Sequence, residues 1–133
     1  MKLYKGKILS YDDWWNILKD NKDVRWKIIA AGGNYGMFER YAPSYSYYKV
    51  EDMSIDDYEE GPGYKRLCFS RFEEENGELK RVGGFPMDNW TNADYEIRVH
   101  NIEPLEIFID WFDTCDGFRG IYIFRDDEDV LKI

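Results

Sequence analysis

The sequence predicts an α+β fold: a mostly antiparallel sheet of about five to six strands with two helices packed on it, plus a long irregular acidic and aromatic loop. Three features lead to this prediction. Two stretches place apolar residues at helical spacing, and several others alternate apolar with polar residues as strands do. Residues 35–63 follow neither pattern. The chain has 133 residues, and we expect residues 1–133 to form a single acidic domain.

The first predicted helix runs from Asp12 to Asp20, after a weak strand pattern over Leu3–Leu9. Ser10 is a favoured helix-capping residue. Asp13, three positions later, completes the pattern of a capping box, in which each side chain bonds the other residue's backbone N–H. The buried face of this helix is expected to follow the i, i+3, i+4, i+7 spacing of Tyr11, Trp14, Trp15 and Leu18.

Alternation and turn residues predict the strands. Val24–Ala31 alternates and then meets Gly32-Gly33, which we interpret as turn residues. Tyr64–Phe72 and Glu78–Val82 flank Asn76-Gly77, the strongest short-range signal for a β-hairpin. These patterns predict a hairpin in the middle of the chain.

Beyond this hairpin, we expect Gly83-Gly84 and Pro86 to end the strand and Met87–Asp94 to form a loop. The remaining predicted strands are Tyr95–His100, Gly120–Phe124 and Val130–Ile133.

Residues 105–112 fit two patterns. Leu105, Phe108, Ile109 and Phe112 have helical spacing, and Pro104 suits a first helical turn. Every second residue from Leu105 to Trp111 is also apolar, as in a strand. We favour a helix because Asp116-Gly117 would end it, and the strand remains the alternative.

The predicted loop at residues 35–63 is the first candidate for a binding surface, because long connections inside a domain are often functional. It combines tyrosines with a run of acidic residues, and a second acidic cluster lies near the end of the chain. The candidate binding residues are Tyr47, Tyr48, Glu51, Asp52, Asp56, Asp57, Tyr58, Glu59, Glu60, Asp126, Asp127, Glu128 and Asp129.

No catalytic or metal-binding motif is present in the sequence. The chain has one histidine, His100, and two cysteines, Cys68 and Cys115, with no metal-ligand spacing and apolar neighbours. The acidic stretches do not match a calcium loop. We therefore expect neither an enzyme nor a bound cofactor or metal.

The net charge of −9 works against direct binding to nucleic acid or to an anionic membrane. It favours a basic protein partner. No basic and apolar leader segment opens the chain, so we expect a cytoplasmic location. The sequence does not determine the oligomeric state.

From these features we hypothesise a small acidic inhibitor that blocks a basic, nucleic-acid-binding partner by occupying its nucleic-acid site. A phage anti-defence protein of the anti-CRISPR or anti-restriction type is the most concrete form, since the residue usage is typical of an AT-rich coding sequence. The alternatives are an immunity protein that neutralises a cognate toxin, and an enzyme or small-ligand-binding protein.

Overall fold

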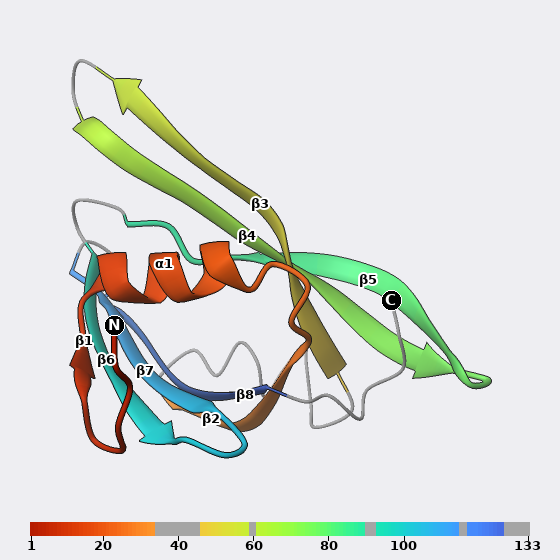
Figure 1. Cartoon of the computed structure of the whole chain (residues 1–133). Coiled ribbons are helices and arrows are strands. Elements are labelled where there is room, and N and C mark those ends of the chain that lie inside the picture. The colour runs from red at the N-terminus through yellow and green to blue at the C-terminus, as the bar shows by residue number, and fades with distance from the viewer. Residues whose placement is uncertain (34–45, 59–60, 90–92, 115–116, 127–133) are drawn as a thin grey trace.

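The computed structural model describes residues 1–33, 46–58, 61–89, 93–114 and 117–126. These residues form one antiparallel sheet of eight strands, with a single described helix on one of its faces (Figure 1). The elements in chain order are β1 (Ile8–Leu9), α1 (Tyr11–Asp20), β2 (Trp26–Gly33), β3 (Ser46–Tyr58), β4 (Gly61–Glu75), β5 (Glu78–Pro86), β6 (Ala93–Asn101), β7 (Glu106–Asp113) and β8 (Phe118–Asp126). The strand order across the sheet is β1-β6-β7-β8-β2-β3-β4-β5.

Helix α1 begins at the predicted cap. The Ser10 hydroxyl accepts the Asp13 N–H at 3.0 Å, and the Asp13 carboxylate accepts the Ser10 N–H at 3.0 Å, which confirms the capping box. The buried residues of the helix are Trp14, Trp15, Ile17 and Leu18. Capping and spacing therefore predicted this helix correctly from local rules alone.

An aromatic cluster centred on Trp14 joins the helix to the sheet. The Trp14 ring lies 5.5 Å from Trp26 on β2, 5.9 Å from Phe124 on β8 and 6.5 Å from Phe69 on β4, all between ring centroids. Phe69 also stacks on Phe124 at 5.6 Å, although two strands separate β4 from β8 in the sheet. In a flat sheet those strands would lie about 14 Å apart. The sheet is therefore bent around Trp14.

The bend has a structural cause at the junction of β2 and β3. These strands share only two residue pairs in the described register, Trp26 with Tyr48 and Lys27 with Tyr47. The pairings on either side of this junction are longer: β2 pairs with β8 from Trp26 with Asp126 to Gly33 with Gly120, and β3 pairs with β4 from Ser46 with Glu73 to Tyr58 with Gly61. Two sub-sheets, β1-β6-β7-β8-β2 and β3-β4-β5, can therefore turn toward each other.

The predicted fold class is wrong in two respects: the sheet has eight strands rather than five or six, and the second helix is a strand. Residues 106–113 form β7, whose Ile107 and Ile109 are fully buried under α1 while Phe108 and Phe112 lie on the opposite face. When both faces of a strand carry apolar residues, the positions spaced three and four apart are apolar too, so the same sequence also fits a helix. This is why the helical pattern was misleading.

The predicted irregular loop is also wrong over its second half. Ser46–Tyr58 forms the 13-residue strand β3, which pairs with β4 from Gly61 to Glu73. Gly83-Gly84 lie within β5 rather than ending it, whereas Pro86 is the last residue of this edge strand. Residues 34–45 and the predicted strand Val130–Ile133 lie outside the described residues.

Strands β3, β4 and β5 form a long ribbon. β4 has 15 residues, but only its middle packs in the core, through Leu67 and Phe69. β3 pairs with β4 from Gly61 to Glu73, and β5 pairs with it from Cys68 to Glu75. Both ends of the ribbon project beyond the helix (Figure 1).

Phe124→Ala is expected to lower the free energy of unfolding by about 3–5 kcal/mol, the usual cost of removing a buried aromatic ring. Urea denaturation followed by tryptophan fluorescence would measure the loss. Ile55→Ala is the control, because Ile55 is 57% exposed, and its truncation should cost less than about 1 kcal/mol. Equal losses in the two variants would contradict the central place of Phe124.

Candidate functional site

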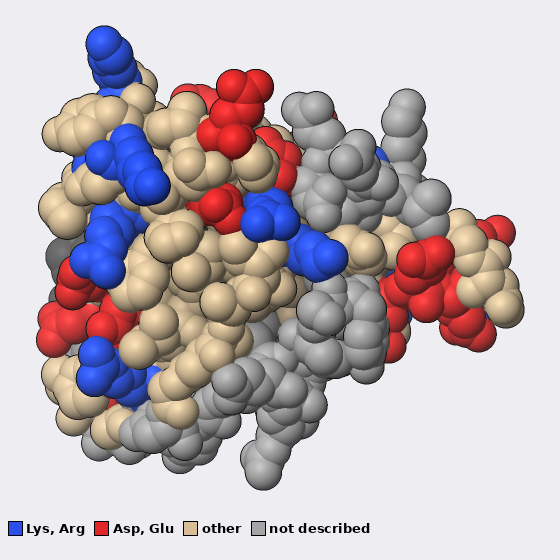
Figure 2. Space-filling model, turned by 90° about the horizontal axis from the view of Figure 1, so that it is seen from below, with Lys and Arg blue, Asp and Glu red and all other residues tan. Residues whose placement is uncertain are grey.

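The β4–β5 hairpin ends in a cluster of carboxylates, which we call the acidic tip: Glu73, Glu74, Glu75 and Glu78. Asn76 and Gly77 form the turn with φ of 53° and 81°, as a two-residue hairpin turn with the twist of its strands requires. Glu74, Glu75 and Glu78 are exposed. In the space-filling view the projecting end at the right is predominantly acidic (Figure 2).

The acidic tip places like charges against one another. Glu75 pairs directly with Glu78 across the hairpin, an arrangement that destabilises a sheet because the two carboxylates repel. Lys80 offsets part of this repulsion through a contact of 3.1 Å with Glu75. A local electrostatic cost at an exposed and otherwise regular hairpin is typical of a functional surface.

Three of the predicted acidic residues on β3 have cationic neighbours. Glu51 accepts a hydrogen bond of 2.8 Å from Arg81 on β5, and this bond raises the pKa of Arg81. Arg66 on β4 lies 3.1 Å from Asp52 and 3.8 Å from Asp56. The ribbon therefore partly neutralises the acidic surface that the sequence predicted along β3.

Tyr47 and Tyr48, two of the predicted binding residues, lie on opposite faces of β3. Tyr48 has no exposed surface and packs in the core at 6.4 Å from Phe124, so it cannot anchor a partner. This corrects the prediction, and the reason is the pleat of β3, which points Tyr48 inward. Tyr47 points to the other face, where the Lys27 ammonium lies 5.9 Å from its ring centroid.

The remaining predicted site residues are only partly placed. Asp57 and Tyr58 belong to β3, and Tyr58 pairs with Gly61 where the β3–β4 hairpin turns. Glu59, Glu60, Asp127, Glu128 and Asp129 lie outside the described residues. Asp126 ends β8, which strands β2 and β3 separate from β4 in the sheet order.

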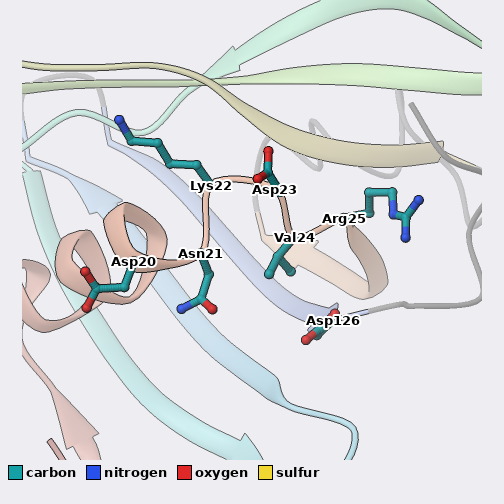
Figure 3. Close-up of a pocket in the computed structure, with 7 residues that line it drawn as sticks. All are labelled: Asp20, Asn21, Lys22, Asp23, Val24, Arg25 and Asp126. Carbon is teal, nitrogen blue, oxygen red and sulfur yellow. The ribbon is translucent and has the colours of Figure 1, made fainter.

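A surface hollow of about 520 Å³ lies where α1 ends and β2 begins. Its lining consists of Asp20, Asn21, Lys22, Asp23, Val24, Arg25 and Asp126. Lys22 and Arg25 extend in different directions, and the carboxylates of Asp20, Asp23 and Asp126 do not converge on one point (Figure 3). The hollow therefore does not assemble an acid–base pair.

A buried polar cluster holds the segment after β5 against α1. The Asp88 carboxylate accepts the Leu67 N–H at 2.8 Å, and the Tyr11 hydroxyl donates to the Met87 carbonyl at 2.5 Å. The Tyr95 hydroxyl donates to the Asp88 carbonyl. Burial is the largest cause that raises the pKa of the Tyr11 and Tyr95 phenols, and the nearby charge of Asp88 raises both further. These groups have structural partners, and they stay protonated at neutral pH.

Two other kinds of site are not found within the part of the chain that the structure describes. No group of three or more histidine, cysteine or carboxylate side chains there could hold a metal ion. No described helix is long and apolar enough to cross a membrane.

No family model matches the chain, and no curated protein or solved structure matches it. The site must therefore be interpreted from its own chemistry. Sequence reasoning missed the acidic tip, although Glu73-Glu74-Glu75 and Glu78 flank the turn that it identified. The missing step was that β4 extends past the core, which exposes Glu74, Glu75 and Glu78 at the end of a hairpin.

Tyr11, Tyr48 and Tyr95 are expected to resist ionisation in the folded protein, because burial raises the pKa of each above the ordinary value of 10.0. In the unfolded chain these phenols ionise near that value. The stability that they contribute is therefore complete below about pH 10 and declines as the pH rises further. Phenolate absorbance against pH, with circular dichroism on the same samples, measures both effects. Ionisation of all 11 tyrosines near pH 10 in a folded protein would contradict the burial of these phenols.

Proposed function

We propose that this protein is a stoichiometric inhibitor that binds a basic, nucleic-acid-binding protein and occupies its nucleic-acid site. The observation that supports the proposal is the acidic tip, with Glu74, Glu75 and Glu78 exposed at the end of a hairpin that projects beyond the core. A projecting hairpin can enter a groove that a flat surface cannot reach.

Electrostatics favours a basic groove as the target. Proteins that hold nucleic acid place lysine and arginine where phosphates bind, and exposed carboxylates on a projecting hairpin can take the same positions. The net charge of −9 would also draw the protein toward a basic partner over a longer range. Both effects weaken as salt is added.

The most concrete form of the proposal is a phage anti-defence protein, of the anti-CRISPR or anti-restriction type, that blocks a nucleic-acid-guided or nucleic-acid-cleaving effector. An immunity protein that neutralises a toxin nuclease would use the same surface. The partner distinguishes them: a defence complex indicates the first, and a single toxin domain the second.

Reversing three charges of the acidic tip in the variant Glu74→Lys, Glu75→Lys, Glu78→Lys is expected to weaken partner binding at least tenfold, since close interfacial charge pairs are worth about 1.5 kcal/mol or more each. The tagged protein would first capture the partner from lysate of its source cells or of a phage host. The affinity of the purified partner for each variant would then be measured at low and at high salt.

The matched control is Asp20→Lys, Asp23→Lys, Glu103→Lys, which changes the net charge by the same amount at exposed positions away from the tip. This control should keep most of the wild-type affinity and lose only the long-range attraction. Unchanged affinity in the tip variant would show that the acidic tip is not part of the interface. Equal loss in both variants would show that net charge alone drives binding.

A further inference from the structure

The face of the sheet opposite α1, over strands β6, β7, β8 and β2, is unusually apolar for a face on which the described residues place no helix. We call it the outer face. In the register of these strands Phe108 pairs with Ile123, Asp110 with Ile121, and Phe112 with Arg119. The exposed faces of antiparallel sheets are normally polar. Here Phe112 is 41% exposed, and Ile8, beside Arg98 at the β1 edge of the same face, is 66% exposed.

The charges on the outer face are balanced. The strand registers place four carboxylates and four cations there, Asp94, Glu96, Glu106, Asp110 and Lys27, Arg98, Arg119, Arg125. The net charge of −9 therefore resides entirely on the rest of the chain. Seen from below, this face shows both signs of charge around uncharged surface (Figure 2).

The charged groups border the apolar residues in an ordered arrangement. The Arg98 guanidinium lies 4.2 Å from the centroid of the Phe108 ring and 3.0 Å from the Glu96 carboxylate. Arg119 forms two hydrogen bonds with Asp110, of 2.9 and 3.2 Å. Paired charges therefore lie among the apolar residues of this face, with Asp110 between Phe108 and Phe112 on β7.

We propose that the outer face binds a second copy of this chain, so that two sheets pack face to face in a symmetric dimer. A twofold interface brings a patch against itself, so the patch must be self-complementary. Two copies that each carry a charge of −9 repel one another, and of the charged surfaces described above only the outer face has no net charge to oppose contact. A basic partner would instead be attracted to the acidic tip.

The proposal also explains why both faces of β7 are apolar. Ile107 and Ile109 pack under α1, while Phe108 and Phe112 would be buried by the partner copy. A strand buried on both faces is expected to have a nearly continuous apolar sequence. This is the feature that made residues 105–112 resemble a helix.

A charge-swap experiment tests the dimer. The variant Arg98→Glu, Arg119→Glu makes the outer face acidic, and the variant Glu96→Arg, Asp110→Arg makes it basic. Sedimentation equilibrium over a concentration series should give twice the 16.0 kDa chain mass for the wild type and the single mass for each variant alone. An equimolar mixture of the two variants should restore the double mass, because opposite faces then attract.

Circular dichroism of each variant first establishes that it is folded, and the wild-type series decides the question even if a variant is not. A wild type that stays at 16.0 kDa at every concentration would overturn the proposal. So would a double mass that survives in both separate variants, since the interface would then lie elsewhere. The acidic-tip variant should still dimerise, so failure of the proposed function and failure of this proposal can be told apart.

Discussion

The stack of Phe69 on Phe124 beneath Trp14 is the interaction on which the rest of the structure depends. It joins strands β4 and β8 across the two strands that separate them, and it is possible only because β2 and β3 pair over two residues. The bend seats the helix, closes the core and turns the middle of the β3-β4-β5 ribbon toward the other sub-sheet, while the ends of the ribbon project beyond the helix. The position of the acidic tip follows from this aromatic cluster.

Local rules predicted the elements whose signals are local. The capping box of Ser10 and Asp13 gave α1, and Asn76-Gly77 gave the β4–β5 hairpin. Elements that depend on distant partners were missed. β3 is stabilised by pairing with β4 and by Arg66 and Arg81 beside its carboxylates, and none of this is visible in its own residues.

The sequence predicted which kind of surface to expect but not where it lies in the fold. Composition indicated an acidic and aromatic surface, yet Tyr48 is buried and the carboxylates of Glu51 and Asp52 are paired with arginines. Glu74, Glu75 and Glu78, which flank the turn after Glu75, are exposed at the end of the hairpin instead. Together with the balanced outer face, they divide the surface into an acidic end suited to a basic partner and a neutral face suited to self-association. A dimer would present two acidic tips.

The central claim is that the protein occupies the nucleic-acid site of its partner. The most direct measurement is competition: whether the isolated partner can bind this protein and its own nucleic acid at the same time, followed by analytical ultracentrifugation with labelled nucleic acid. The account predicts mutual exclusion, with the labelled nucleic acid released in proportion to the protein added. A stable ternary complex, with nucleic acid still bound at saturating protein, would contradict it.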